Sequence, residues 1–213
     1  MEIKYFGHSS FQIKTKTARV ITDPFDPKMV GLKFPKTEAD IVTVSHHHHD
    51  HDMTNQVEGN PLILDWPGQF EKMGVRIWGF ITYHDKKKGE ERGINIMYKF
   101  ESEQISILHC GDLGAIPDDA ILDEVGEIDI LFVPVGGTYT IDSTEAAELI
   151  KKVEPSIIIP MHYGIPEGAI KELAPLSDFL KIMRKDAVEP IEKFIVKKED
   201  LLDQEIKVIV LRT

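Results

Sequence analysis

Five histidines fall within six residues of one segment, in the run SHHHHDH at residues 45–51. The run contains the pattern His-x-His-x-Asp-His and directly follows an apolar stretch that is typical of a buried strand. Alternate side chains of an extended chain point the same way, so His46 and His48 are expected to converge on one metal ion. Asp50 and His51 come from the following turn and are expected to serve a second ion. A solvated histidine-rich loop or an expression tag is the alternative, but a tag normally stands at a terminus and this run is internal.

Three further candidate ligands each follow a predicted strand. They are His84 after residues 75–83, Asp112 after residues 104–109, and His162 after residues 156–160. A single residue of this kind would more often be a cap or a hydrogen-bonded surface group. Three of them beside the histidine run indicate a metal site, because two ions need ligands from distant segments at strand ends where loops converge. Imidazole and carboxylate ligands suit zinc, and they also accept iron or manganese.

Other segments point to a known superfamily. They are GHSSF at 7–11, ITDPF at 21–25, HCGDLG at 109–114, PVGGTYTID at 134–142 and PMHYG at 160–164. Together with the histidine motif, they resemble the metallo-β-lactamase fold of metal-dependent hydrolases. More narrowly, they are similar to the Zn-dependent hydrolases of this fold that are related to the ascorbate-6-phosphate lactonase type. The resemblance implies an α/β fold, a four-layer αββα sandwich, with the metals at one edge between the sheets.

The resemblance also implies a ligand set. His46, His48 and His84 would hold one divalent ion, Asp50, His51 and His162 would hold the other, and Asp112 would bridge them. Zinc is the favoured metal, with manganese or iron as alternatives. Two close cations lower the pKa of a bridging water, so we expect hydroxide to attack a small ester, lactone or phosphoester. Asp50 is the expected catalytic residue, because it would orient this nucleophile and carry a proton to the leaving group.

One ligand has a competitor, and several other residues are candidates for supporting contacts. His109 competes with His84 as the third ligand of the first ion. His109 and Asp112 are an odd number of residues apart, so their side chains face opposite ways on an extended strand. His84 is therefore favoured, and His109 is expected in the core or holding a ligand in place. The other candidates for the pocket or its support are His8, Asp23, Tyr139 and Tyr163. A structural histidine is an equally good interpretation of His8, and a plain turn residue of Asp23.

The elements that must position these residues form an α/β pattern. Strands are expected at 3–6, 11–14, 19–22, 40–44, 62–65, 75–82, 93–100, 104–109, 128–133, 156–160 and 206–211. Helices are expected at 117–125, 142–153 and 173–184, and Asp142 with Glu145 matches a capping box. Residues 28–37 are predicted to form a loop, and the charged run 85–92 a solvated hairpin loop. No change in composition divides the chain, so we expect a single domain over residues 1–213.

Composition and charge exclude or disfavour several classes of protein. The chain has 213 residues, 42% of them hydrophobic and 29% charged, which excludes a disordered chain. No apolar run approaches the roughly 20 residues that a membrane span requires. The net charge of −11 disfavours nucleic acid as a partner, so a small-molecule substrate is expected. The single Cys110 excludes an intramolecular disulfide and a cysteine-based zinc site. The first residues lack the pattern of a secretory signal, so a cytoplasmic protein is expected.

Two other functions on the same fold remain open at this point. One is a redox protein with two irons, which usually carries more carboxylate ligands than this chain offers. The other is a metal-binding protein without turnover, against which the full set of ligands argues. The pattern of residues leaves the substrate and the oligomeric state open.

Overall fold

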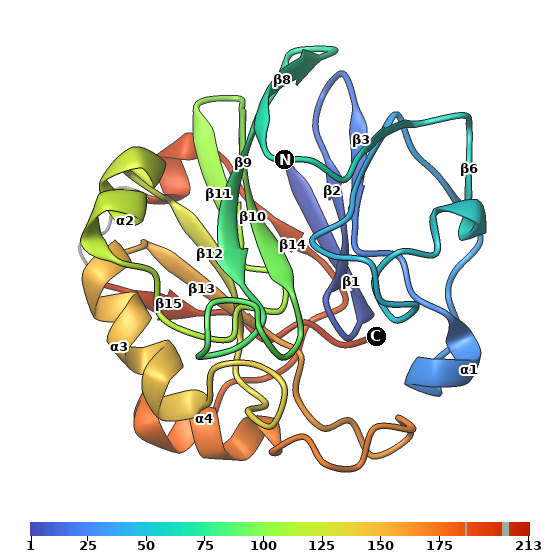
Figure 1. Ribbon diagram of the computed structural model, residues 1–213. Coiled ribbons are helices and arrows are strands. Elements are labelled where there is room, and N and C mark those ends of the chain that lie inside the picture. The colour runs from blue at the N-terminus through green and yellow to red at the C-terminus, as the bar shows by residue number, and fades with distance from the viewer. Residues whose placement is uncertain (186, 202–204) are drawn as a thin grey trace.

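Two β-sheets pack face to face in the computed structural model, which describes residues 1–185, 187–201 and 205–213 (Figure 1). The first sheet has six strands in the order β14-β1-β2-β3-β5-β7. Its strands are β1 (Glu2–Gly7), β2 (Ser10–Lys14), β3 (Arg19–Thr22), β5 (Ile41–Thr43), β7 (Leu62–Leu64) and β14 (Phe194–Ile195). Burial alternates along β1, so one face of this strand packs on the core while the other is partly exposed.

The second sheet has seven strands in the order β15-β13-β12-β11-β10-β9-β8. Its strands are β8 (Gly68–Lys72), β9 (Val75–Tyr83), β10 (Ile94–Ser102), β11 (Ile105–His109), β12 (Ile130–Pro134), β13 (Ile157–Met161) and β15 (Lys207–Val208). Every residue of β12 and β13 is buried, as expected of parallel strands that are covered on both faces. A short pair, β4 (Thr37–Glu38) and β6 (Val57–Glu58), lies apart from both sheets.

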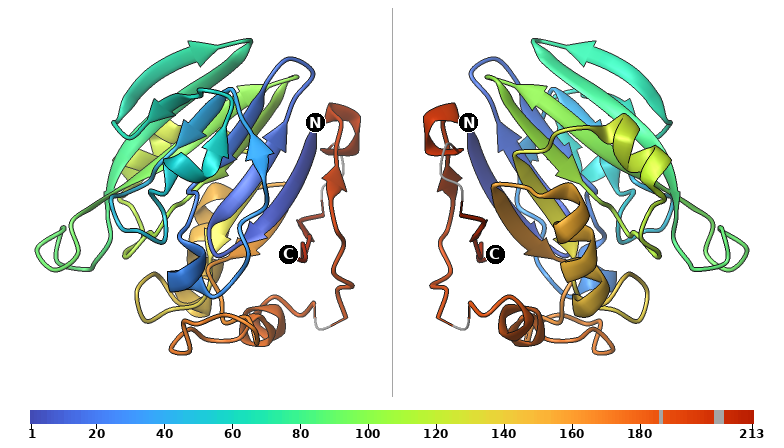
Figure 2. Two further views of the ribbon diagram at one scale, coloured as in Figure 1. Left: turned by 90° about the vertical axis from the view of Figure 1, so that its right-hand side faces the viewer. Right: turned by 90° about the vertical axis from the view of Figure 1, so that its left-hand side faces the viewer.

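Helices complete the layers, and the two views of Figure 2 show them on opposite sides of the sheets. The helices are α1 (Pro27–Val30), α2 (Asp119–Val125), α3 (Ser143–Val153) and α4 (Leu176–Ile182), with 3-10 turns at Thr54–Gln56 and Lys198–Leu201. The last three helices cover the second sheet, whereas α1 lies beside the first. The capping box of Asp142 and Glu145 is present at the start of α3. The layer order is therefore αββα, with a thin outer layer on the first sheet.

Two hydrophobic clusters match these layers. The larger cluster includes Phe11, Ile13 and Val20 of the first sheet and Phe132 of the second, and it fills the space between the sheets. The rings of Phe11 and Phe132 stack with their centroids 4.2 Å apart. The smaller cluster lies on the outer face of the first sheet, where Ile21, Phe25, Val30, Phe34 and Val42 are buried together. Residues 20 and 21 thus face opposite sides of the same sheet, as the alternation of a strand requires.

Strand direction decides where the chemistry can lie. In the first sheet β1, β3, β5 and β7 run the same way, and in the second β9, β11, β12, β13 and β15 run the same way. The carboxyl ends of co-directional strands meet at one edge of a sheet, where the loops that follow them converge. The candidate ligands follow strands of these two sets.

Most predicted elements match the observed ones, but the short strands β6 and β14 and the two 3-10 turns were not expected, and the structure differs in four further places. The expected loop at 28–37 is wrong in part, because α1 begins at Pro27 behind an Asp26 cap and β4 begins at Thr37. The helix expected at 173–184 is shorter and begins only after Pro175, because the backbone of Ala174 hydrogen-bonds to Gly136 and Gly164 instead. The strand expected at 206–211 is limited to β15, after which the chain bridges to Ile191. The edge strand β8 was not expected.

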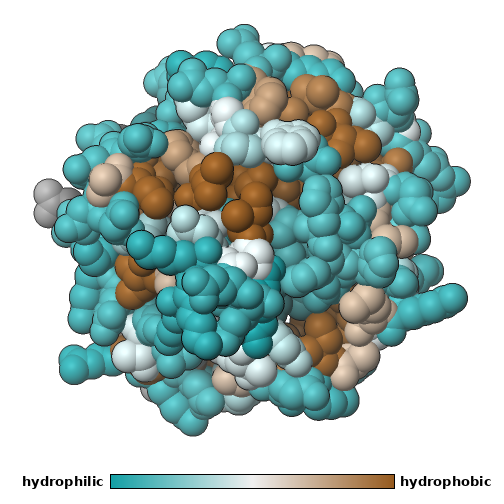
Figure 3. All heavy atoms as spheres, in the orientation of Figure 1, coloured by the Kyte–Doolittle hydropathy of each residue, from teal (hydrophilic) through white to brown (hydrophobic). Residues whose placement is uncertain are grey.

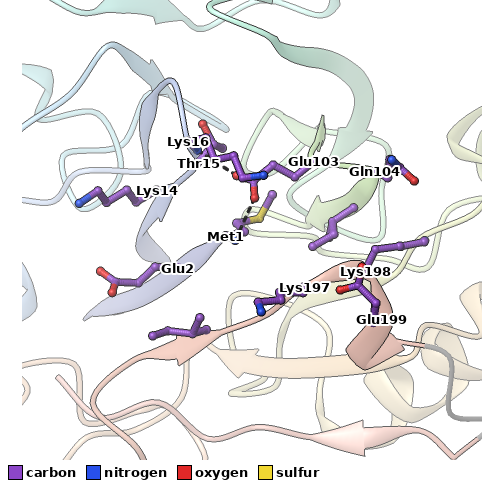
Figure 4. A pocket seen from close by; sticks show the side chains of 12 residues that line it. Met1, Glu2, Lys14, Thr15, Lys16, Glu103, Gln104, Lys197, Lys198 and Glu199 are labelled. Carbon is purple, nitrogen blue, oxygen red and sulfur yellow. Dashed lines mark hydrogen bonds and ion pairs between the residues drawn. The ribbon is translucent and has the colours of Figure 1, made fainter.

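A cleft of about 640 Å³ lies at the opposite edge of the sheets, near the amino ends of the strands. It is lined by Met1, Lys14, Glu103, Lys197 and other residues (Figure 4). The ammonium group of Met1 contacts a Glu103 carboxylate oxygen at 3.2 Å, and the other oxygen accepts a hydrogen bond from the Lys16 N–H. None of the candidate ligands lines this cleft, so its size does not make it the candidate site. Among the described residues, none of the helices combines the length and the apolar composition needed to cross a bilayer.

Candidate metal centre

Histidines and aspartates from six strand ends meet at the carboxyl edge of the two sheets. They are His8 after β1, Asp23 after β3, residues 46–51 after β5, His84 after β9, Asp112 after β11, and His162 after β13. His8, Asp23, His46, His51, His84, Asp112 and His162 are buried, whereas Asp50 is partly exposed and residues 47–49 are exposed. These residues are up to 154 positions apart in the sequence, so the shared direction of the strands is what brings them together.

The carboxylate of Asp112 lies at the centre of the cluster. Its Oδ2 atom is 3.3 Å from His51 Nε2, 3.5 Å from His84 Nε2 and 3.2 Å from His162 Nε2. Donor atoms of one ion lie at about these separations, since a metal–nitrogen bond measures about 2.0–2.1 Å. Asp112 therefore sits between imidazoles that the ligand set assigns to two different ions, as a bridging carboxylate must.

The first group of imidazoles consists of His46, His48 and His84. Their candidate ligand atoms all lie within 4.8 Å of one another. His46 Nε2 is buried and has no hydrogen-bond partner among the described residues, and the same is true of His84 Nδ1. Buried polar atoms without partners are costly in a folded protein. A cation at this group would satisfy His46 Nε2, so the residues present fit a metal ion.

The second group consists of His8, His51 and His162, whose candidate ligand atoms also lie within 4.8 Å of one another. Asp50 stands beside this group, with its Oδ2 atom 3.8 Å from His51 Nε2 and 3.2 Å from His8 Nε2. The side chain of Asp50 is 19% exposed, so this carboxylate is open to solvent while the three imidazoles are buried.

Asp23 orients the second group through hydrogen bonds on the side away from the other ligands. One carboxylate oxygen accepts the Ser45 N–H at 2.8 Å, and the other accepts the Ser45 hydroxyl at 2.6 Å and lies 2.9 Å from His51 Nδ1. A proton on Nδ1 leaves the lone pair of Nε2 pointing into the cluster, which is how a carboxylate orients a metal-ligating imidazole. The Ser45 hydroxyl is also 2.9 Å from His46 Nδ1. A single carboxylate thus orients one imidazole in each half of the cluster.

Asp112 is positioned by two residues that were not among the candidates, Asn95 and Ser9. Its backbone N–H donates to the side-chain carbonyl of Asn95 at 2.8 Å, and Ser9 Oγ lies 3.4 Å from its Oδ1 atom. Asn95 is a buried amide inside the apolar strand β10, and this exception to the apolar pattern is the signal that could have indicated its role. A Cβ at Gly111 would collide with the side chains of Asn95 and Ser45, so only glycine fits at this position.

Three residues of the cluster have left-handed backbone conformations. The φ angles are 57° at His8, 39° at Asp23 and 51° at His162. Such conformations cost free energy in residues other than glycine and are typical of functional sites. The His162 N–H donates to the His8 carbonyl at 2.8 Å, which ties the turn after β13 to the turn after β1.

The electrostatics of the cluster favour cation binding. Burial lowers the pKa of His46 and of His84, so both imidazoles are held neutral. Burial raises the pKa of Asp112, but the neighbouring His162 and His51 outweigh it and hold this pKa well below its ordinary value. Burial lowers the pKa of His51, but Asp112 and Asp23 outweigh it and raise this pKa well above its ordinary value. A cation that binds His51 must displace that proton, as metal binding commonly does.

The remaining candidate residues lie around the cluster. His109 is fully buried, its Nε2 is 2.8 Å from the Ser9 carbonyl and its ring packs against Phe11, so it lies in the core behind the cluster. Tyr163 is next to His162, and burial raises its pKa to about 12. Tyr139 is partly exposed and stacks with Arg92. Between the candidate ligands, the side chains of His47 and His49 are 67% and 74% exposed and turn away from the cluster.

The charged loop next to His84 is more ordered than its composition indicated. Asp85 is buried, and its carboxylate accepts hydrogen bonds from four backbone N–H groups. The donors are Lys87, Gly89, Glu91 and Arg92, at 2.7–3.0 Å. These bonds lower the pKa of Asp85 to about 2 against a burial effect that raises it. The loop is a hairpin connection as expected, but it is built around one buried carboxylate.

Replacing Asp85 with alanine is expected to loosen this loop without unfolding the protein. The four N–H groups lose their acceptor, so their amide hydrogens should exchange at least about tenfold faster. Hydrogen–deuterium exchange of residues 86–93 is the measurement. Glu91→Gln is the matched control, because the Glu91 side chain contributes an exposed ion pair with Lys87 and the backbone N–H is unchanged. Unchanged exchange in Asp85→Ala would show that the carboxylate does not organise the loop.

A narrow cleft lies beside His8, with a volume of only about 10 Å³, which is room for about one water molecule. It is lined by His8, Gly168 and the apolar side chains of Val30, Leu32, Tyr163, Ile165, Ile170 and Leu173. Its outer wall is the segment after β13, which is held to α1 by a hydrogen bond from Ala169 N to Val30 O at 2.8 Å. Figure 3 shows hydrophobic side chains below and to the right of the centre of this face, in the region between α1 and α4. The cleft therefore offers an apolar wall beside the cluster.

Comparison with known proteins agrees with this arrangement. The model of the β-lactamase superfamily domain matches residues 2–162, which include every candidate ligand. Among solved structures, a candidate Zn-dependent hydrolase of the metallo-β-lactamase superfamily from Thermotoga maritima is 38% identical. The alignment covers 99% of this chain and 97% of that chain, with a TM-score of 0.80.

Two curated relatives are similar along most of their length. A UPF0173 metal-dependent hydrolase of Thermococcus onnurineus is 29% identical, over 77% of this chain and 85% of the relative. A UPF0173 metal-dependent hydrolase of Nanoarchaeum equitans is 28% identical, over 95% of this chain and 100% of the relative. The family resemblance and the αββα fold expected from the sequence are thereby confirmed.

Proposed function

Because the chain belongs to the β-lactamase superfamily, we propose that it is a dinuclear metal-dependent hydrolase acting on a small ester or lactone. The observation that carries this proposal is the convergence of two imidazole groups on the Asp112 carboxylate. The relatives named as metal-dependent hydrolases support the class of reaction. The candidate ligands come from both sheets, so we take residues 1–213 to act as one domain.

Each proposed ion has its own set of protein donors. His46, His48 and His84 would hold the first ion, Asp50, His51 and His162 the second, and Asp112 would bridge both. Bound there, two cations would activate water near neutral pH and polarise the oxygen of the bond to be cleaved. Zinc is the metal that we propose, because imidazole-rich sites suit it, and manganese or iron is the alternative.

Asp50 is the group in the chain placed to handle protons. Its carboxylate is partly exposed at the edge of the cluster, whereas Asp23 and Asp112 are buried and engaged. Burial raises the pKa of Asp50, but the hydrogen bond with His8 and the charge of His51 outweigh it and lower the pKa. Asp50 is therefore ionised, which suits a residue that orients the attacking water and accepts its proton. It would then pass this proton to the leaving group.

The cleft beside His8 favours an uncharged substrate over a phosphoester. Its walls are apolar side chains, and lysine and arginine are absent from the described residues that line it. A phosphoester carries negative charge and is usually bound by basic groups or by backbone N–H groups. An ester or lactone with a short hydrocarbon chain would instead pack that chain on the outer side of this apolar wall, against the partly exposed Ile165 and Ile170.

A panel of model substrates tests this function. We expect hydrolysis of p-nitrophenyl butyrate with a kcat/KM about tenfold above that of p-nitrophenyl acetate. The reason is that each buried methylene contributes about 0.8 kcal/mol and the butyrate has two more. Bis(p-nitrophenyl) phosphate should be the poorer substrate. Removing metal with a chelator should abolish the activity, and added zinc should restore it.

A variant pair assigns the preference to the cleft. Ile170→Asn should remove most of the advantage of the butyrate ester, because it places a polar group in the apolar wall. Ile182→Asn is the matched control, since Ile182 is an exposed residue of α4 that does not line the cleft. Hydrolysis that survives complete removal of metal would refute the proposed function. Equal rates on both esters would refute only the role of the cleft.

A further inference from the structure

His8 comes from the turn after β1, more than thirty residues before the histidine run, yet it reaches into the second imidazole group. Its Nε2 atom is 3.1 Å from His51 Nε2 and 3.2 Å from Asp50 Oδ2. Its ring centroid is 4.2 Å from that of His162. The residue is only 3% exposed, so its imidazole is committed to the interior of the cluster.

The backbone holds His8 in this position from two sides. The Tyr5 hydroxyl and the His162 N–H both donate hydrogen bonds to the His8 carbonyl, each at 2.8 Å. The left-handed φ of 57° directs the side chain away from the path of the strand. Tyr5 and His162 thus fix the turn at a conformation that a residue other than glycine rarely adopts.

The Nε2 atoms of His8 and His51 face each other, and this limits the roles that His8 can have. His51 Nδ1 is paired with the Asp23 carboxylate, so the Nε2 lone pair of a neutral His51 points toward His8. Two imidazole nitrogens at 3.1 Å either share a proton or bind the same cation. Donors of one ion with metal–nitrogen bonds of about 2.1 Å lie about 3.0–3.4 Å apart in octahedral or tetrahedral geometry. The observed separation falls in this range.

We propose that His8 is a ligand of the second metal position, through the Nε2 atom that faces His51 and Asp50. This inference rests on the proposed metal centre and adds an eighth residue to it. The second position then has His8, His51 and His162 as imidazole donors, matching the three imidazoles of the first. Asp112 lies between the two groups. Asp50 stays beside these imidazoles, and its partly exposed carboxylate remains available for the proton transfer assigned to it.

The alternative is that His8 only donates a hydrogen bond to Asp50. His8→Gln separates the two roles, because a glutamine amide N–H can donate to Asp50 but provides no imidazole lone pair. His8→Ala removes both interactions. His49→Ala is the matched control, since His49 lies in the same motif but its side chain is 74% exposed.

The measurement is the affinity of each metal-free protein for two equivalents of zinc, by competition with a chromophoric chelator. We expect His8→Gln and His8→Ala to keep one site at the wild-type affinity and to bind the second ion at least about tenfold more weakly. His49→Ala should retain both affinities. Circular dichroism of each metal-free variant checks that it is folded.

Two results would overturn the inference, and they are distinguishable. If His8→Gln binds both ions with the wild-type affinities, His8 is not a ligand, while the proposed function stands. If the wild-type protein itself fails to bind two ions, the dinuclear centre is wrong, and the role of His8 falls with it.

Discussion

Replacing Asp112 with alanine is expected to lower the hydrolytic kcat/KM by roughly a thousandfold or more, equivalent to about 4 kcal/mol of activation free energy. The carboxylate is buried and lies within 3.5 Å of imidazoles from both groups, so its loss removes a donor from each proposed ion at once. The variant should also retain less than two equivalents of metal. Steady-state kinetics and elemental analysis of the same preparation are the measurements.

Asp52→Ala is the matched control for this effect. Asp52 follows the histidine run, but its ion pairs are with the exposed His47 and His49. We expect it to keep both the metal and most of the activity, because exposed ion pairs contribute little. If Asp112→Ala kept wild-type metal content and activity, Asp112 would not bridge the two ions.

Replacing Asp23 with alanine is expected to have the largest effect on stability. The change leaves the Ser45 N–H, the Ser45 hydroxyl and His51 Nδ1 without their buried acceptor. Removing one partner of a buried charged network costs about 3–5 kcal/mol. Metal affinity should fall by about tenfold to a hundredfold, because His51 loses the carboxylate that orients it. Urea unfolding of the metal-free protein and zinc competition measure the two effects separately.

Asp26→Ala provides the comparison for Asp23. Asp26 is three residues away and caps α1 through the Lys28 N–H, outside the cluster. Its loss should cost about 0.5–2 kcal/mol of stability and leave zinc affinity unchanged. Equal losses in the two variants would mean that Asp23 acts only as a turn residue.

The positions of the candidate ligands were predictable because they depend on one regular feature of the fold. His46, His84, Asp112 and His162 each stand at the end of an apolar run, and the carboxyl ends of co-directional strands meet at one edge. His109 does lie in the core, but the chain from it to Asp112 is not an extended strand, because β11 ends at His109 and Gly111 has a φ angle of 57°. Periodicity was enough to place these side chains near one another.

Other features depend on irregular backbone and could not be derived from periodicity. The approach of His8 to His51 depends on a left-handed turn, which the sequence marks only with the preceding glycine. In the sequence, Asn95 and Ser45 look like any other polar residues. The structure shows that Asn95 hydrogen-bonds to Asp112 and that Ser45 hydrogen-bonds to Asp23. Asp85 belongs to a strongly charged run, and only the fold of the loop shows that its carboxylate is buried.

The central claim is a dinuclear metal centre, and anomalous X-ray scattering from crystals of the untagged protein tests it most directly. Data collected at the zinc absorption edge should show two peaks about 3.5–4 Å apart, on either side of the Asp112 carboxylate. One peak should lie among His46, His48 and His84, and the other beside His51 and His162. A single peak, or none, in crystals grown with saturating zinc, manganese or iron and measured at the corresponding edge would contradict the account.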